Sequence, residues 1–315
     1  MFKAEKFIEE TIELLKKQVL DKALIAFSGG VDSTVCAVLV NKAIGSQLIA
    51  VHVDTGYMRK NESQNVKKIM KKMGLNLRFI DASKEFYKDL KDVIDPEKKR
   101  KIIGEKFIRV FEKVAEEEKI QYLVQGTIAP DWIESGDNLR DNIKSHHNVG
   151  GLPKHMKLKL VEPLRDLYKD EVRKVARSLK LEVSEKQPFP GPGLAVRIIG
   201  EATLERVDIV REACFIVEEE IEKAVEKGKM DIPWQYFAVL LPIKSVGVQG
   251  DKRAYGYVIC VRAVQSVDAM TCAYSIIPHD VLDKISTRIT NSMKDKINRV
   301  VYDITNKPPG TVEWE

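Results

Sequence analysis

The segment at residues 28–33, SGGVDS, combines residue types that suit the binding of a phosphate chain. Two glycines let the backbone approach an anion closely, and the N–H groups at the start of a following helix point toward it with a favourable dipole. Ser28 and Ser33 can donate hydroxyl hydrogen bonds, and Asp32 can hold a divalent cation. The segment has neither the Gly-Lys-Ser/Thr of a Walker A loop nor the GxGxxG fingerprint. We predict an oligophosphate-binding loop; the alternative is an ordinary turn in which Ser33 or Asp32 caps the helix.

Further residues could act on a nucleotide or on a proton. Asp54 closes an apolar run about 20 residues after the loop, where an acidic side chain often meets a ribose, although it could also cap a turn. Asp131 and Glu134 are three residues apart, so on a helix they would share one face and could take a proton, or cap the backbone locally. His146 and His147 are adjacent, and on an extended segment they would point to opposite faces, which disfavours a metal site.

The first half of the chain alternates between strand and helix patterns around these residues. Short apolar runs predict strands at 23–27, 48–53, 77–80 and 122–124. Helical spacing opens the chain, with apolar residues at Ile8, Ile12, Leu15 and Val19, and returns at 33–43, 61–73 and 168–179. Strands that alternate with helices form parallel βαβ units, and continuous apolar strands suit a sheet covered on both faces. We therefore predict an α/β fold with a doubly wound parallel sheet.

The pattern changes in the second half. It weakens in a polar stretch at 126–163, and stretches of this length without secondary structure are usually lids or disordered segments. The prolines and glycines of 187–193 exclude a helix interior and a central strand, so we place a domain boundary there. Beyond it, helical patterns at 204–227 and 281–293 mix with β-rich runs at 237–241, 255–264 and 300–304. The sequence therefore predicts two domains: residues 1–187, with the lid 126–163, and a smaller α+β domain at 188–315.

Composition excludes several classes of protein. The chain has 315 residues, with 52 Lys+Arg against 47 Asp+Glu and a formal net charge of +5, a mild balance that selects neither nucleic acid nor an anionic small molecule as partner. No apolar run approaches the roughly 20 residues that span a bilayer, and the start of the chain has no apolar signal-peptide core. The four cysteines are scattered without CxxC pairs, so they suit neither a disulfide framework nor a structural zinc site. We expect a globular, cytoplasmic protein.

The SGGVDS loop is the signature of the N-type ATP pyrophosphatases, which this sequence resembles. Within that superfamily the chain resembles the synthetase portion of the GMP synthetase family over essentially its whole length. The resemblance rests on long motifs in the same order: HVDTGYMR (52–59), DPEKKRKIIG (95–104), QGTIAPDWIES (125–135), KSHHNVGGLP (144–153), EPLRDLYKDEVR (162–173), QPFPGPGLAVR (187–197), GVQGDKRAYGY (247–257) and RVVYDITNKPPGTVEWE (299–315). Residues 185–187 and 294–296 depart from the family pattern, and the first departure removes a basic pair that precedes PFPGPG in the family.

The resemblance implies a reaction in which ATP adenylates xanthosine monophosphate (XMP), releasing pyrophosphate, and ammonia then displaces AMP to give GMP. Mg²⁺ would bridge the ATP phosphates and be held by Asp32. ATP would be bound by Ser28, Gly29, Gly30, Val31, Asp32, Ser33, Thr34 and Asp54. XMP would be bound by Arg100, Gln249, Arg299, Lys307, Val312 and Glu313. The lid would exclude water from the adenylated intermediate and carry the catalytic residues Asp131, Glu134 and Lys144, the last on the ATP phosphates.

Two of these assignments compete with plainer interpretations. The basic run at 98–101, which contains Arg100, could be a solvated helix face. The prolines and charged residues near the end of the sequence could belong to a frayed terminus. The aromatic residues between Tyr302 and Trp314, together with Val312, favour a docked segment instead.

The resemblance also implies partners. No cysteine lies in the Gly-Xaa-Cys-Xaa-Gly turn that a glutamine amidotransferase needs, so we expect ammonia from a separate glutaminase subunit. The C-terminal domain would serve dimerisation, giving a homodimer with no membrane and no nucleic acid as partner. A tRNA-modifying enzyme of the same superfamily is the alternative; it would carry cysteine pairs and a basic RNA-binding face, and the sequence shows neither. A regulatory nucleotide-binding subunit is disfavoured by the intact loop with Asp32, by Lys144 and by the C-terminal segment.

Overall fold

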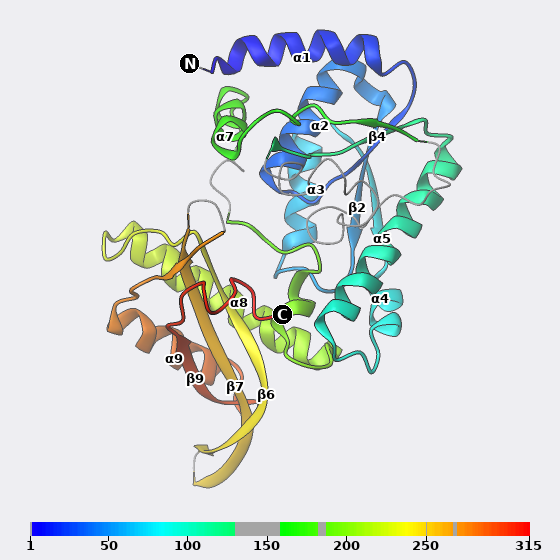
Figure 1. Ribbon diagram of the computed structural model, residues 1–315. Coiled ribbons are helices and arrows are strands. Elements are labelled where there is room, and N and C mark those ends of the chain that lie inside the picture. The colour runs from blue at the N-terminus through cyan, green and yellow to red at the C-terminus, as the bar shows by residue number, and fades with distance from the viewer. Residues whose placement is uncertain (1, 130–157, 182–186, 250, 267–269) are drawn as a thin grey trace. The chain divides into compact units, whose positions relative to one another are not determined.

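The computed structural model in Figure 1 describes residues 2–129, 158–181, 187–249, 251–266 and 270–315. These residues form two compact units, and neither unit is one continuous stretch of sequence. Unit 1 comprises Met1–Gly56, Asn61–Lys84 and Lys101–Gly191. Unit 2 comprises Tyr57–Lys60, Glu85–Arg100 and Pro192–Glu315. Two short segments from the first half of the chain therefore belong to the unit that holds the C-terminal third.

Unit 1 is built on a five-stranded sheet in the order β3-β2-β1-β4-β5. The strands are β1 (Ala23–Ala26), β2 (Leu48–Asp54), β3 (Asn76–Asp81), β4 (Tyr122–Val124) and β5 (Lys159–Val161). Every neighbouring pair is parallel, which confirms the predicted parallel sheet of an α/β fold. The strand β5 lies inside the stretch 126–163, where no element was predicted, because three residues that run from exposed to buried carry no periodic signal.

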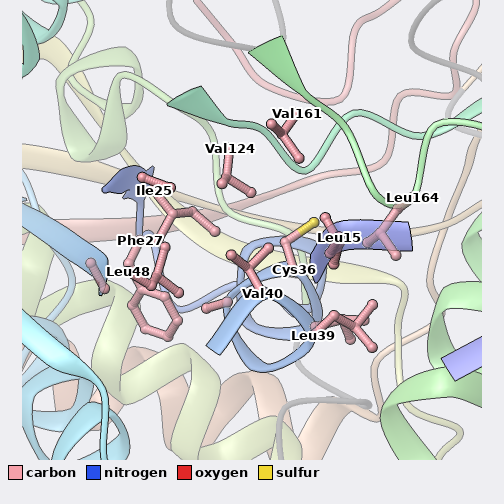
Figure 2. Packing of buried hydrophobic residues seen from close by; sticks show 14 of the residues in the cluster. Leu15, Ile25, Phe27, Cys36, Leu39, Val40, Leu48, Val124, Val161 and Leu164 are labelled. Atoms are coloured by element: carbon pink, nitrogen blue, oxygen red, sulfur yellow. The ribbon is translucent and has the colours of Figure 1, made fainter. Parts of the chain in front are cut away.

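Helices accompany the strands of unit 1 in the expected alternation. They are α1 (Ala4–Gln18), the central α2 (Val31–Ile44) with the short 3-10 turn η1 (Gly45–Gln47), α3 (Glu62–Lys72), α5 (Pro96–Glu118) and α7 (Lys169–Ser178). The start of α5, up to Arg100, and most of α4 (Ser83–Asp89) belong to unit 2. The helices α1, α2 and α7 pack against one another. Figure 2 shows the core beside them, in which Leu15 of α1, Val40 of α2, Ile25 of β1 and Val161 of β5 lie together. This packing holds the turn between β1 and α2 on a rigid base.

Unit 2 has an antiparallel hairpin at its centre. Its elements are the 3-10 helix η3 (Gly193–Arg197), α8 (Leu204–Glu226), β6 (Gln235–Gln249), β7 (Lys252–Gln265), β8 (Ala273–Tyr274), α9 (His279–Ser292) and β9 (Ile297–Asp303). The strand β7 pairs antiparallel with β6 and β8, and parallel with β9. The long helix α8, capped by the side chain of Thr203, packs on β6 and on α9. This arrangement confirms the predicted α+β character.

The hairpin is longer than predicted. The apolar runs at 237–241 and 255–264 coincide with buried parts of β6 and β7, but β6 continues to Gln249 and β7 begins at Lys252. Exposed side chains such as Ile243, Val246 and Val248 fill the added length. A strand that is not covered lacks the continuous apolar run on which the prediction depended. In the part of the chain that the structure describes, no helix is long and apolar enough to cross a membrane.

The first of the two short N-terminal segments of unit 2, Tyr57–Lys60, is held by specific contacts. The hydroxyl of Tyr57 donates to the Ala202 carbonyl oxygen at 3.2 Å, and Arg211 Nε donates to the Met58 carbonyl oxygen at 3.0 Å. Lys60 Nζ lies 2.7 Å from a carboxylate oxygen of Glu212. These contacts join the segment after β2 to the region of α8.

Candidate functional site

The predicted phosphate loop connects β1 to α2. Gly29 has φ +77°, a left-handed conformation that favours glycine, and a Cβ there would lie only 2.8 Å from Val66 Cγ2 of α3. Within the loop, the hydroxyl oxygens of Ser28 and Ser33 are 3.0 Å apart, and the Ser33 hydroxyl donates to the Gly30 carbonyl oxygen at 3.2 Å. The same carbonyl accepts a 2.7 Å bond from the Thr34 hydroxyl. The loop is therefore compact, and it leads directly into the amino-terminal end of α2, where orphan N–H groups favour an anion.

Asp32 lies in the first turn of α2 and has two unlike carboxylate oxygens. Its Oδ2 accepts a 2.6 Å bond from Lys169 Nζ at the start of α7. Its Oδ1 is buried and has no hydrogen-bond partner among the described residues. A buried carboxylate oxygen without a partner is costly unless a cation or donor completes it. Asp32 Oδ1 therefore suits Mg²⁺ as a ligand, because Mg²⁺ prefers carboxylate oxygens and otherwise keeps water and phosphate ligands.

Lys169 was not among the predicted site residues. The segment EPLRDLYKDEVR (162–173) contains it, but the helical spacing of that segment gives no indication that α7 begins beside the loop. The contact joins residues 137 positions apart in the sequence. Lys169 thus brings a positive charge to the loop that a phosphate chain could share.

Asp54 ends β2, and β2 is the parallel neighbour of β1. The carboxyl ends of adjacent parallel strands share one edge of the sheet, which is where nucleotides bind in open α/β folds. Asp54 Oδ1 accepts a 2.9 Å bond from Gly56 N, so the side chain caps the turn that follows the strand. Asp54 therefore caps a turn, and its contact with a ribose stays a prediction.

Several predicted residues lie outside the described part of the chain. These are the lid residues Asp131, Glu134, Lys144, His146 and His147. The backbone of Gln249 is described at the end of β6, but its side chain is not.

The remaining predicted residues belong to unit 2. Arg299 is exposed on β9. Lys307 follows that strand and forms a two-bond backbone bridge with Cys272. Val312 and Glu313 lie further along the same C-terminal segment, which packs onto the unit instead of fraying. Arg100 lies in the first two turns of α5.

Three buried cations hold the C-terminal segment, and the first is Arg262 of β7. Its guanidinium donates to the carbonyl oxygens of Thr305 and of Thr311, the latter at 2.9 Å, and lies 3.2 Å from Asp303 Oδ2. The second is Arg197, which donates from Nε and Nη2 to the two carboxylate oxygens of Glu313 at 3.1 and 2.9 Å. Such a paired contact fixes the orientation of the carboxylate as well as its position.

The third cation is Lys99, whose side chain is fully buried. Its ammonium donates to the carbonyl oxygens of Ile198 at 2.8 Å and Ala195 at 3.2 Å, and to the carboxylate of Glu315. Burial lowers the pKa of Lys99, and the hydrogen bond to Glu315 opposes that effect. The other carboxylate oxygen of Glu315 accepts from Gly200 N at 3.0 Å.

Arg100 joins the same contact, since its guanidinium donates to the main-chain oxygen of Glu315. The alternative interpretation of 98–101 as a solvated helix face does not hold for Lys99, which is buried, although its neighbour Lys98 is exposed. The sequence holds one signal for this cluster: Arg262 is a single charge inside an apolar strand, and such a charge is rarely buried without partners.

A parallel α/β sheet that presents the SGGVDS loop between its first strand and the following helix defines a nucleotide-binding protein of the N-type ATP pyrophosphatase class. Comparison with protein families agrees. The model of the Queuosine biosynthesis protein QueC matches residues 22–187, and the model of the GMP synthase C terminal domain matches residues 219–314.

Individual relatives narrow the assignment. The B subunit of the glutamine-hydrolyzing GMP synthase of Methanopyrus kandleri is 58% identical over 319 residues, which cover 100% of both chains. The glutamine-hydrolyzing GMP synthase of Thermotoga petrophila is 55% identical over 98% of this chain but only 62% of its own. A solved structure of NMN synthetase from Francisella tularensis has a TM-score of 0.48 and 14% identity, covering 73% of this chain and 89% of its own. The chain belongs to the family of GMP synthase B subunits.

Proposed function

We propose that this protein is a ligase that converts XMP to GMP, using ATP to adenylate XMP and ammonia to displace AMP. The full-length identity of 58% with the B subunit of a GMP synthase is the observation that carries this proposal. The compact loop after β1, with the partnerless Asp32 oxygen at its edge, supports the ATP-dependent step. The name of the relative, glutamine-hydrolyzing, supports glutamine as the source of the ammonia.

In this proposal, the loop binds and orients the pyrophosphate part of ATP. The loop residues 28–34 and Asp54 would bind ATP, with backbone N–H groups and the Ser28 and Ser33 hydroxyls donating to phosphate oxygens. Asp32 would hold Mg²⁺, which neutralises negative charge on the phosphates when it is bound. Lys169, which donates to Asp32, would then have a phosphate oxygen as a second acceptor in the same site. Positioning and charge neutralisation are the main contributions that a protein makes to transfer at phosphorus.

XMP would be bound by unit 2. Lys307, Val312 and Glu313 lie on the C-terminal segment, which the three buried cations hold in place, and a preorganised segment loses less entropy on binding. The proposed XMP site further includes Arg100, Arg299 and Gln249. We assign residues 1–187 to ATP and residues 188–315 to XMP and to dimerisation, with Arg100 as an exception because it packs in unit 2.

The remaining assignments follow the family. The stretch 126–163 would close over the nucleotides, with Asp131 and Glu134 orienting ammonium and taking its proton and with Lys144 on the phosphates. A separate glutaminase subunit would supply the ammonia, and the longer chain of the Thermotoga petrophila relative supports a division of one enzyme into two proteins. We place the reaction in the cytoplasm, in a homodimer.

A turnover assay tests this function. Protein with ATP, Mg²⁺, XMP and ammonium should release AMP and pyrophosphate in equal amounts and form GMP. Lys307→Ala should raise the KM for XMP and leave the KM for ATP nearly unchanged, because a Lys amine suits the nucleotide phosphate. Lys227→Ala, at an exposed position after α8, serves as the matched control. AMP release with tRNA and not with XMP would instead support the tRNA-modifying alternative.

A further inference from the structure

His52 is a buried imidazole in β2, and the reaction proposed above gives it no role. Its Nδ1 lies 2.9 Å from the carbonyl oxygen of Phe27, and its Nε2 lies 3.2 Å from the hydroxyl of Ser63. A carbonyl oxygen can only accept, so Nδ1 carries the proton. In the neutral ring Nε2 is then an acceptor, and the hydroxyl of Ser63 donates a hydrogen bond to it.

Both partners of His52 lead to the phosphate loop. Phe27 directly precedes Ser28, and its N–H still donates to the Val51 carbonyl oxygen at 2.8 Å, so Phe27 is the last residue tied to the sheet before the loop. Ser63 lies in the first turn of α3, and Val66 of the same helix lies so near the loop that a Cβ at Gly29 would be 2.8 Å from Val66 Cγ2. His52 therefore links the start of the loop to the helix that packs beside it.

The peptide unit gives this link a directional effect. The Phe27 carbonyl and the Ser28 N–H belong to one planar trans peptide, so they point in opposite directions. A hydrogen bond that holds the carbonyl against His52 also sets the direction of the Ser28 N–H. Loop N–H groups are the donors that a phosphate chain meets, and small errors in their direction weaken binding.

We propose that His52 is a positioning residue for the loop: through the Phe27 carbonyl it fixes the first loop peptide in the orientation that binds the ATP phosphates. This rests on the proposed function of the loop as the ATP site. Burial lowers the pKa of His52, which keeps the ring in the neutral form that this geometry needs. The hydrogen bond to Phe27 opposes this shift most, Asp54 and Glu62 also oppose it, and Lys67 acts with it. The ring stacks on Phe79 at 5.9 Å between centroids.

Two substitutions separate the two hydrogen bonds of the ring. An Asn amide nitrogen can take the place of Nδ1, so His52→Asn keeps the donor to Phe27 and loses the contact with Ser63. A Gln amide reaches the place of Nε2, so His52→Gln keeps a partner for Ser63 and loses the donor to Phe27. Ser63→Ala is the matched control, because it removes the Nε2 partner alone.

We expect His52→Gln to raise the KM for ATP about tenfold, the effect of one lost hydrogen bond to a buried carbonyl. His52→Asn and Ser63→Ala should stay within about threefold of the wild type, and the KM for XMP should not change in any variant. Thermal unfolding of each variant shows whether it is folded. Equal effects of His52→Asn and His52→Gln on the KM for ATP, or a parallel rise in the KM for XMP, would overturn the proposal.

Calorimetric binding of a non-hydrolysable ATP analogue separates this proposal from the function on which it rests. Wild-type protein that binds the analogue but does not act on XMP would contradict the proposed reaction. The order of the His52 variants in their Kd for the analogue would then decide the positioning role. Wild-type protein that binds no analogue would contradict both. If His52→Gln does not fold, His52→Ala takes its place. The role of the Phe27 bond is refuted if His52→Asn or Ser63→Ala raises the Kd for the analogue as much as His52→Ala does.

Discussion

The contact of Lys99 with Glu315 permits a quantitative prediction for Lys99→Met. The ammonium is fully buried and the Glu315 side chain is only 7% exposed, so the substitution leaves a carboxylate facing an apolar side chain of similar length. Removing one partner of a buried ion pair costs about 3–5 kcal/mol of stability. The hydrogen bond from Gly200 N to Glu315 remains and offsets a small part of that cost.

The loss need not unfold the whole unit. Glu315 lies on the C-terminal segment, so the segment can leave its binding position and return the carboxylate to water when this is less costly than staying. A destabilisation of about 3 kcal/mol shifts a docking equilibrium on the order of 100-fold. The apparent affinity for XMP falls with the fraction of protein in which the segment is docked. We therefore expect a KM for XMP raised by up to about 100-fold and a KM for ATP within about twofold of the wild type.

Trp314 gives a second readout of the same event. Its indole N–H donates to Asp303 Oδ2 at 3.0 Å, and release of the segment would expose the ring further. Intrinsic fluorescence of Lys99→Met should shift to longer wavelength, while Lys98→Met, one residue earlier and exposed, should resemble the wild type in both assays.

The double substitution Lys99→Met with Glu315→Leu completes the test. Replacing both partners leaves no unpaired charge, and such replacements are often neutral or stabilising. The double variant should recover most of the fluorescence and stability that the single variant loses. A wild-type KM for XMP and unchanged fluorescence in Lys99→Met would refute the reasoning, as would a double variant that is no better than the single one.

Two further outcomes follow from unit 1. Asp32→Asn should slow pyrophosphate release at least tenfold and raise the Mg²⁺ concentration needed for half-maximal activity, because it removes the charge of the partnerless oxygen; an unchanged Mg²⁺ dependence would remove Asp32 from the metal site. The lowered pKa of His52 predicts an acid-dependent loss of stability. The folded protein disfavours the protonated ring, so neutral His52 makes its full contribution to the free energy of unfolding above about pH 6.5. That contribution falls by up to about 1.4 kcal/mol per pH unit as the pH drops toward the lowered pKa. In urea unfolding, the difference in free energy of unfolding between the wild type and His52→Asn should therefore narrow from about pH 7 to about pH 5.5. A difference that stays constant would contradict the lowered pKa of His52.

The phosphate loop and the sheet around it could be predicted because both depend on local sequence. The loop follows an apolar run and precedes a helical pattern, and Gly29 occupies a left-handed position that its residue type favours. The strand β5 and the outer half of the β6–β7 hairpin were missed because one is three residues long and the other is largely exposed. Neither gives the continuous apolar run that identifies a buried strand.

The ion pairs could not be predicted for a different reason. Lys169 meets Asp32 across 137 residues and Lys99 meets Glu315 across 216, and no periodic pattern spans such distances. In the sequence, Lys99 looks like its exposed neighbour Lys98. Only the fold decides which of two adjacent lysines is buried, because helix geometry sets their side chains about 100° apart.

The discontinuous make-up of unit 2 has a consequence for recombination between family members. A fragment that starts at Pro192 would lack Lys99 and Arg100, which contact Glu315, and the Met58 carbonyl that Arg211 binds. In a chimera that exchanged the C-terminal third between two relatives, the C-terminal third of one protein would have to pack on residues 57–60 and 85–100 of the other. The two units are therefore expected to be inherited together, and a functional exchange would have to carry these two short segments with it.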